Sequence, residues 1–208
     1  MADETKPGES GEAKAEPPKP IPPAAKPAAA KPAAPKPPAV MVTTPWSDEF
    51  TERVKAQFPD ATIEFAAYLG QKFLLTKWES VPALVDYLKE EEQFDYLVDI
   101  TAVDWPKREA RFDLVYILYS FARNERIRIK AQVKEGDKPQ SVVDIHRTAD
   151  WLEREVFDMF GIEFANHPGL KRILMPDEWE GHPLRKDYNI LQMDNRWVRE
   201  NAGIESGQ

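Results

Sequence analysis

Hydrophobic residues follow two different periods along residues 46–162. Apolar residues spaced by three or four positions, as in Val81, Leu84 and Leu88, predict helices, whereas apolar and polar residues in alternation predict strands. The predicted elements, in chain order, are a helix between Ser47 and Pro59, strands over 63–69 and 72–78, a helix after Ser80, strands over 94–103, 111–121 and 126–134, and a helix over 147–160. This α-β-β-α-β-β-β-α order predicts an α+β domain of two layers, with helices packed on a largely antiparallel or mixed sheet.

Several details of these elements follow from local rules. Ser47 and Ser80 are the predicted N-caps of the first two helices, because a serine hydroxyl can accept a hydrogen bond from a free amide of the first turn. The strand over 111–121 is apolar on both faces, which predicts a central strand covered on both sides. The short link before residue 126 predicts an antiparallel hairpin. Alternation over 94–103 assigns one face to Phe94, Tyr96, Val98, Ile100 and Ala102.

The helix over 147–160 has one apolar face and one charged face. Its apolar face is formed by Leu152, Val156 and Met159. Its charged face carries Asp150, Arg154 and Asp158, whose four-residue spacing predicts a ladder of ion pairs. Trp151 and Phe160 are interpreted as core aromatics, and Gly161 suits the left-handed residue that ends a helix.

After this helix the periodicity stops, and residues 163–208 are predicted to form an extended arm. Proline follows His167, Met175 and His182, and a residue before proline disfavours helical geometry. The arm nevertheless carries many large apolar side chains. These must be buried either against their own domain or against another protein, and the residues alone leave both options open.

Composition separates residues 1–45 from the rest. This segment holds 12 of the 19 prolines and no aromatic residue, so it is predicted to be a disordered or polyproline-like tail rich in Pro, Ala and Lys. The boundaries that follow are a tail over 1–45, an α+β domain over 46–162 and the arm over 163–208. A tail that acts as the linker of a tethered adaptor is one alternative for its role.

Charge and residue usage exclude several classes of function. The net charge of −8 disfavours binding to nucleic-acid phosphates. The absence of cysteine excludes disulfides, cysteine-ligated iron–sulfur clusters and thiolate zinc sites. The acidic start lacks the apolar segment of a secretory signal, and no apolar run approaches the ~18 residues of a membrane span. Membrane contact is therefore expected only through other proteins or a surface.

Few residues suggest catalysis. His167 and His182, with the acidic residues Asp177, Glu178 and Glu180, are the candidate ligands of a metal site in a stand-alone hydrolase, although their spacing matches no compact ligand motif. Glu153 and Glu155 are too close in sequence to face each other on a helix, so a paired acid–base role is disfavoured. There is no GxGxxG, P-loop or nucleophile elbow.

One strand face is basic. Arg126, Arg128, Lys130 and Lys134 share it, and they could bind an anion or an anionic lipid. The favoured interpretation is an ordinary solvated face, on which long basic side chains also discourage edge-to-edge association.

A longer motif carries a family resemblance. The segment EREVFDMFGI over 153–162, followed by His167, Lys171, Ile173 and Leu174, resembles the C subunit of NADH:quinone oxidoreductase, respiratory complex I. The arm segments RILMP over 172–176 and GHPLRKDY over 181–188 resemble the same family, with weaker matches at 99–104, 111–112 and 126–130. The resemblance covers about residues 47–188 and does not include the tail or the residues after Tyr188.

The resemblance implies a non-catalytic structural subunit of the peripheral arm of this proton-pumping complex, at the cytoplasmic face of the bacterial inner membrane. It implies that the chain itself binds no cofactor, and that NADH, FMN, iron–sulfur clusters and quinone belong to other subunits. The main partner would be the D subunit, which is the quinone-site subunit, with other peripheral-arm subunits beside it. A subunit of a related plastoquinone-linked or hydrogenase-type complex is the alternative.

The resemblance also implies that the arm wraps a partner. The expected partner-binding residues combine apolar anchors with charged residues of the motif and the arm. They are Glu153, Arg154, Glu155, Asp158, Phe160, His167, Leu170, Arg172, Ile173, Leu174, Trp179, His182, Leu184, Arg185, Lys186, Asp187 and Tyr188.

Overall fold

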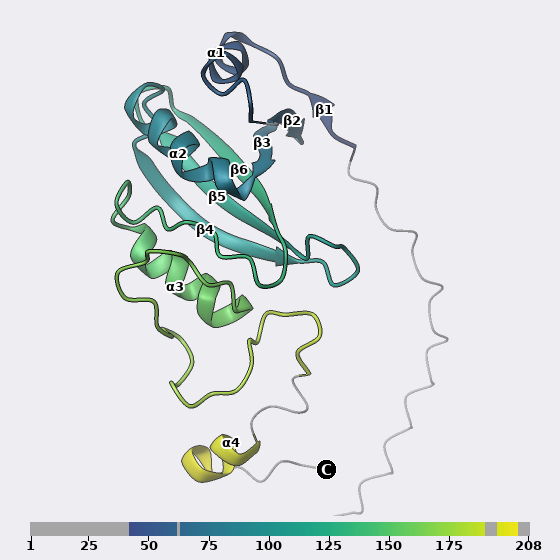
Figure 1. Ribbon diagram of the computed structural model, residues 1–208, viewed down its shortest axis with the longest axis vertical. Coiled ribbons are helices and arrows are strands. Elements are labelled where there is room, and N and C mark those ends of the chain that lie inside the picture. The colour runs from purple at the N-terminus through teal and green to yellow at the C-terminus, as the bar shows by residue number, and fades with distance from the viewer. Residues whose placement is uncertain (1–41, 62, 190–194, 204–208) are drawn as a thin grey trace, which may run out of the picture. The chain divides into compact units, whose positions relative to one another are not determined.

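The computed structural model describes residues 42–61, 63–189 and 195–203 (Figure 1). Its elements are β1 (Thr44–Pro45), α1 (Glu49–Gln57), β2 (Glu64–Tyr68), β3 (Gln71–Lys77), the 3₁₀ helix η1 (Trp78–Ser80), α2 (Val81–Glu90), β4 (Tyr96–Asp104), β5 (Phe112–Ser120), β6 (Glu125–Val133), α3 (Ala149–Phe160) and α4 (Asn195–Ala202). The predicted order of helices and strands is confirmed, with β1 and α4 added at its ends. The predicted tail lies outside the described residues except for 42–45, which include β1.

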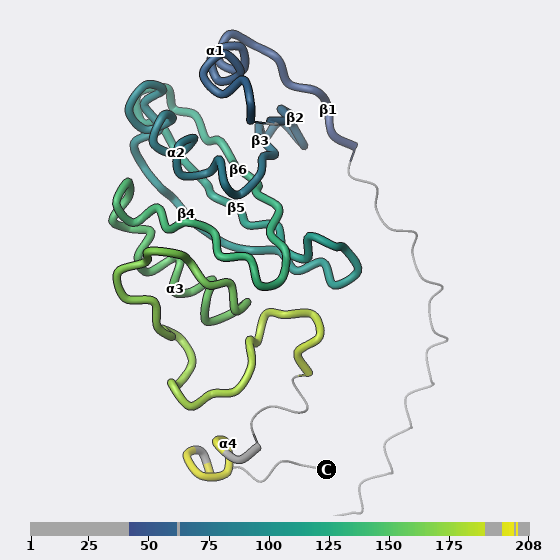
Figure 2. The backbone as a smooth tube through the Cα atoms, in the orientation of Figure 1, coloured from purple at the N-terminus to yellow at the C-terminus, as the bar shows by residue number. Residues whose placement is uncertain are grey.

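The strands form one mixed sheet in the order β1-β2-β3-β6-β5-β4, and the tube in Figure 2 follows the chain through it. All pairings are antiparallel except β3 with β6, which is parallel and aligns Leu74 with Ile129. The predicted hairpin is confirmed by β5 and β6, whose link contains Asn124 at φ 51°. No helix in the described part of the chain is long and apolar enough to cross a bilayer.

The two predicted N-caps turn out differently. Asp48, not Ser47, caps α1: its carboxylate accepts the Thr51 amide at 3.0 Å, and the Thr51 hydroxyl accepts the Asp48 amide at 3.0 Å. The prediction was therefore one residue early. Ser80 does occupy the N-cap position of α2, but its side chain makes no capping bond because η1 already gives it a helical backbone.

A β-bulge in β4 overturns part of the predicted alternation. The register with β5 shifts between Leu97 and Asp99, so one extra residue is inserted into β4. An extra residue reverses the facing of everything before it. Leu97 is consequently buried at 2% exposure, whereas Tyr96, expected beside Ile100, is 47% exposed.

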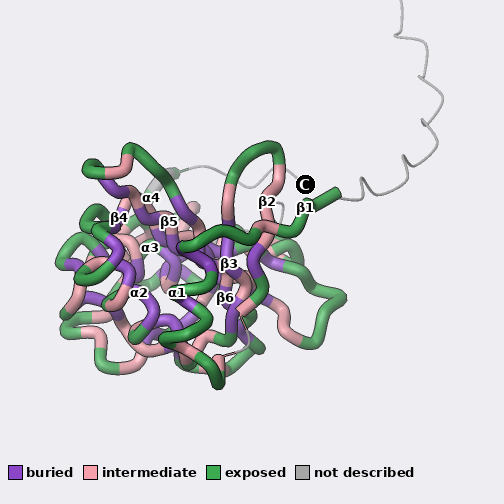
Figure 3. Tube along the Cα trace, turned by 90° about the horizontal axis from the view of Figure 1, so that it is seen from above, coloured by how far each residue is buried: buried purple, intermediate pink, exposed green. Residues whose placement is uncertain are grey.

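One face of the sheet packs against the hydrophobic core, and Figure 3 marks the buried residues along the chain. Leu114, Tyr116 and Leu118 of β5 are fully buried there. On the opposite face Val115 is buried, but Ile117 remains half-buried. The prediction that β5 is covered on both sides is therefore correct only in part.

The basic face of β6 is a solvated strand surface, as favoured from the sequence. Arg126 is exposed and Arg128 half-buried. Lys130 lies over the Phe73 ring at 4.4 Å, where its stem covers apolar surface. Lys134 follows the strand and pairs with Glu109.

Helix α3 contacts β4 and brings a carboxylate into the core. Glu153 is fully buried, and its Oε1 accepts the Val142 amide at 2.8 Å. Burial raises the pKa of Glu153 to about 7, although hydrogen bonds from Ser141 and Val142 oppose this. Glu155, two residues later, is exposed, so the two glutamates diverge as predicted.

The substitution Glu153→Gln should change how stability depends on pH. The folded-state pKa of Glu153, about 7, exceeds the ordinary value of 4.5, so the folded chain binds more protons than the unfolded chain between these values. This group's contribution to the free energy of unfolding therefore falls as pH rises from about 4.5 to 7. Relative to wild type, the variant should gain up to roughly 3 kcal/mol across this window.

Urea unfolding at pH 5 and pH 7.5 measures the effect. The matched control is Glu155→Gln, which removes an exposed carboxylate from the same helix. Identical pH dependence in the two variants would contradict the assignment.

Candidate functional site

Residues 163–189 of the arm run back along α3 (Figure 2). His167 Nε2 lies 3.1 Å from the Asp150 carbonyl oxygen, near the start of the helix. Arg154 donates to the carbonyls of Lys171 and Arg172 at 3.2 and 3.1 Å. The arm therefore packs against its own domain.

Asp158 is the strongest tether between helix and arm. Its Oδ2 accepts the amides of Ile173, Leu174 and Met175 at 3.0, 2.7 and 2.8 Å, and its Oδ1 accepts Arg172 at 2.6 Å. The carboxylate is fully buried. Burial alone would raise the pKa of Asp158, but the three amides and the guanidinium lower it below its usual range. An ionised carboxylate therefore shapes the backbone at 173–175.

The arm also satisfies the C-terminal carbonyls of α3, which have no partner within the helix. The pairs are His182 Nδ1 with the Asp158 carbonyl (2.9 Å), Leu184 N–H with Met159 (3.1 Å) and Arg185 Nε with Phe160 (2.5 Å). A guanidinium at this end also complements the helix dipole.

Gly161 makes this close approach possible. It ends α3 at φ 75°, as its predicted role requires. A Cβ at this position would lie 2.5 Å from His182 Nε2 and 2.9 Å from an Arg185 Nη atom. Glycine is therefore needed both for its backbone conformation and for the space that the arm occupies.

Residues 185–187 of the arm join an ion-pair network at the edge of the sheet. Arg111 pairs with the buried Asp104 at 2.8 Å and with Asp187 at 2.7 Å. Arg185 pairs with Glu135 at 2.7 Å, and the Lys186 amide donates to Asp104 at 2.7 Å. The arm is consequently held at both ends of its path over the domain.

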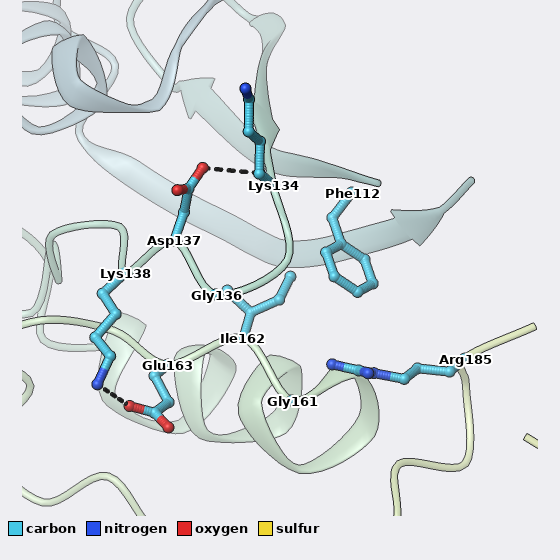
Figure 4. A pocket seen from close by; sticks show the side chains of 9 residues that line it. All are labelled: Phe112, Lys134, Gly136, Asp137, Lys138, Gly161, Ile162, Glu163 and Arg185. Carbon is cyan, nitrogen blue, oxygen red and sulfur yellow. Dashed lines mark hydrogen bonds and ion pairs between the residues drawn. The ribbon is translucent and has the colours of Figure 1, made fainter. Parts of the chain in front are cut away.

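A small hollow lies beside this network (Figure 4). Arg185 reaches toward Gly161 and Ile162 at its border, and Lys138 pairs with Glu163 at 2.6 Å. Its volume of about 60 Å³ is well below the ~300 Å³ of ordinary ligand pockets. It has room for ordered water but not for a substrate or cofactor.

The structure divides the predicted partner-binding residues into three groups by exposure. Buried side chains belong to Glu153, Asp158, Phe160, His167 and Trp179. Exposed residues are Glu155, Leu174, Leu184, Lys186 and Asp187. The remaining ones, Arg154, Leu170, Arg172, Ile173, His182, Arg185 and Tyr188, are half-buried. Contact with a partner remains a prediction, and the exposed group is the one available for it.

The predicted ion-pair ladder on α3 is wrong. Asp150, Arg154 and Asp158 do have the spacing for mutual contact, but each faces the arm instead. Backbone carbonyls of the arm accept from Arg154, backbone amides of the arm donate to the buried Asp158, and Asp150 faces the His167 ring. An exposed ion pair along a helix, worth only about 0.5 kcal/mol, cannot compete with such contacts.

The candidate ligands of the hydrolase alternative do not converge. The Gly169 amide donates to His167 Nδ1 at 3.0 Å while Nε2 faces the Asp150 carbonyl, so both ring nitrogens are engaged. His182 lies at the other end of α3, against Asp158. No group of three or more His, Asp or Glu residues within the described ranges is arranged to hold a metal ion.

Trp151 was misassigned from the sequence. Phe160 is a core residue at 6% exposure, but Trp151 is 68% exposed. The signal was present in the helical period: about 100° per residue places Trp151 roughly 150° away from the buried Ala149 and Val156. The aromatic side chain suggested a core residue, whereas its position on the helix indicated an exposed one.

Comparison with known proteins identifies the family. The profile described as "Respiratory-chain NADH dehydrogenase, 30 Kd subunit" matches residues 74–193. The chain is 43% identical over 143 residues to the C subunit of NADH-quinone oxidoreductase from Geotalea uraniireducens, covering 68% of this chain and 87% of that protein. It is 41% identical over 142 residues to the C/D subunit of NADH-quinone oxidoreductase from Bdellovibrio bacteriovorus, covering 68% of this chain and 25% of that longer protein.

A solved structure shares the fold. A chain in the membrane-bound sulfane sulfur reductase, an archaeal respiratory membrane complex, superposes with a TM-score of 0.60 at 26% identity, covering 76% of this chain and 93% of that chain. The chain therefore belongs to the family of the respiratory-chain NADH dehydrogenase 30 kDa subunit, which includes the C subunit of NADH-quinone oxidoreductase, and the resemblance carried by residues 153–162 is confirmed.

Proposed function

We propose that this chain is a non-catalytic structural subunit of a proton-pumping NADH:quinone oxidoreductase, and that its arm docks on the quinone-site D subunit and positions it. The chain would carry no cofactor, with NADH, FMN, iron–sulfur clusters and quinone held by other subunits. It would lie at the cytoplasmic face of the bacterial inner membrane and meet the membrane only through the complex.

One observation carries the docking proposal. Buried polar contacts fix the arm, yet Leu174 is 61% exposed and Leu184 is 50% exposed. The backbone of each leucine is fixed by a hydrogen bond. The Leu174 amide donates to the Asp158 carboxylate, and the Leu184 amide donates to the Met159 carbonyl. Apolar side chains on a pre-shaped backbone are suited to binding, because little conformational entropy is left to lose.

One further observation favours the D subunit as the partner, and another supports the non-catalytic role. The Bdellovibrio relative is named as a C/D subunit, so in that protein the two subunits belong to one chain. This chain has no cysteine, which accords with electron transfer by other subunits. The similarity to a sulfane sulfur reductase chain keeps a related complex as the second candidate, but the NADH-quinone oxidoreductase relatives are more similar in sequence.

The double substitution Leu174→Asp plus Leu184→Asp should abolish incorporation into the complex without unfolding the chain. Both side chains are at least half exposed, so the domain tolerates the charges, whereas a docked interface would have to bury them. The measurement is recovery of NADH:quinone oxidoreductase subunits from gently solubilised membranes through a tag on the chain. We expect a loss of about tenfold or more.

The matched control is Leu69→Asp, which places the same charge at a leucine that is 84% exposed in the β2–β3 turn. Recovery should equal that of wild type. Normal recovery with the double variant would contradict docking by the arm, and loss with the control would show a nonspecific effect of charge.

Gly161→Ala tests whether the arm's fixed path matters for assembly. The new Cβ would be strained at φ 75° and would displace His182 and Arg185, so we expect a loss of about 2–4 kcal/mol in the free energy of unfolding and reduced assembly. Gly136→Ala is the control, because its φ of 89° gives comparable strain but no atom lies within 4 Å of the added Cβ. The control should lose only about 1 kcal/mol in the free energy of unfolding. Equal losses for Gly161→Ala and Gly136→Ala in chemical denaturation would contradict a role for the arm contact.

A further inference from the structure

A second apolar surface lies away from the arm's exposed leucines. An open hollow of about 450 Å³ lies beside the first residues of β4 and the first turn of α3. It is lined by Tyr96, Leu97, Val98, Arg147, Thr148, Trp151 and Leu152. This volume is within the range of sites that accept a large side chain or a small ligand.

The walls of the hollow are unusually apolar for an exposed surface. Trp151 is 68% exposed and Tyr96 47% exposed, while Leu97 beneath them is 2% exposed. The aromatic surface continues to Phe121, which is 66% exposed and lies 5.7 Å from the Tyr96 ring centroid. Contiguous apolar surface of this kind marks interaction sites more often than ordinary solvent-facing surface.

Two local features create this surface. The bulge after Leu97 turns Tyr96 outward. The helical period turns Trp151 away from the buried face of α3. β4 is also an edge strand, and within the described ranges no other strand pairs with its outer side.

Arg147 adds a charge to the rim. It is exposed and forms no ion pair with the residues that the structure describes, although the chain has 36 acidic residues against 28 basic ones. Arginine, tryptophan and tyrosine are the residues most enriched where interfaces gain their binding energy. Arg147, Trp151 and Tyr96 line the same hollow.

We propose that this hollow is a second docking site, occupied by a segment of another subunit of the complex. The segment inserts one large apolar side chain between Trp151 and Tyr96, and it presents a carboxylate to Arg147. The proposal rests on membership of the complex and not on docking by the arm, so the two can fail separately.

The chain's own residues 1–41 are a poor occupant. Their acidic residues all lie between positions 3 and 16, where there is no aromatic residue and no Leu, Ile or Val. Met1 is the one large apolar residue within four positions of these carboxylates, so none of them has an aromatic or branched aliphatic side chain beside it.

Site-specific photo-crosslinking in the assembled complex tests the proposal. p-Benzoylphenylalanine replaces Trp151 in the full chain, which conserves an exposed aromatic side chain, and the purified complex is irradiated and analysed by peptide mass spectrometry. We expect a crosslink to another subunit, at a peptide with an acidic residue within about four positions. The same probe at Leu69 is the negative control, and at Leu174 it reports on the arm independently.

Three results would overturn the proposal. They are a crosslink from position 151 to residues 1–41 of the same chain, a crosslink to a second copy of the chain, and no crosslink in the intact complex. A crosslink from position 174 alone would leave docking by the arm intact while removing the second site.

Charge reversal gives an independent measure. Arg147→Glu should lower retention of the crosslinked subunit about tenfold during a salt wash, and reversing the partner's acidic residue to lysine should restore it. Arg126→Glu, at an exposed arginine of β6, is the matched control and should have no effect. Unchanged retention with Arg147→Glu, or failure of the reversed pair to restore it, would contradict the assigned contact.

Discussion

The buried carboxylate of Asp158 is the constraint on which the arm depends. An ionised carboxylate can be withdrawn from water only if hydrogen bonds and a cation replace its hydration. Here three consecutive amides and Arg172 do so, and those amides in turn have Asp158 as their acceptor. An amide withdrawn from water without a partner costs about 1–3 kcal/mol. The part-buried bonds to Asp158 therefore leave the backbone at 173–175 few alternatives to this conformation. Segment 163–189 has no helix or strand of its own, so the hydrogen bonds to Asp158 hold its conformation in place of regular secondary structure.

Two arginines of the arm, Arg172 and Arg185, are half-buried near the C-terminal end of α3, while Leu174 and Leu184 are exposed. This placement is understandable if the polar contacts fix the conformation and the exposed leucines provide affinity. Hydrogen bonds are directional and specify one geometry, whereas burial of leucine contributes about 25 cal/mol per Å² with little directionality. The ordering entropy is then lost on folding and not on binding.

How far the sequence could predict this structure depended on the range of the interactions. Alternation and helical spacing are local, and they predicted the order of the elements, the β5–β6 hairpin and the divergence of Glu153 and Glu155. The bulge in β4 was not predictable, because Leu97 and Val98 are both apolar and the sequence does not show which of them faces the core. The partner of Asp158 was missed for another reason. Its four-residue spacing from Arg154 satisfied a local rule, whereas its actual partners are backbone amides 15 to 17 residues away, which no side-chain pattern identifies.

Helix α3 links these features. Its buried face packs on the sheet, its C-terminal carbonyls hold the arm, and its first turn presents Trp151. Trp151 and Asp158 are seven residues apart on one rigid helix, a separation of about 10 Å along its axis. Surfaces fixed to the same helix cannot move independently, so a partner bound to the arm and a partner bound beside Trp151 would be held in one relative orientation. Where both docked segments belong to one partner, binding of the first would also raise the effective concentration of the second. In the proposed complex, the chain would in this way determine the geometry of neighbours that carry the redox groups.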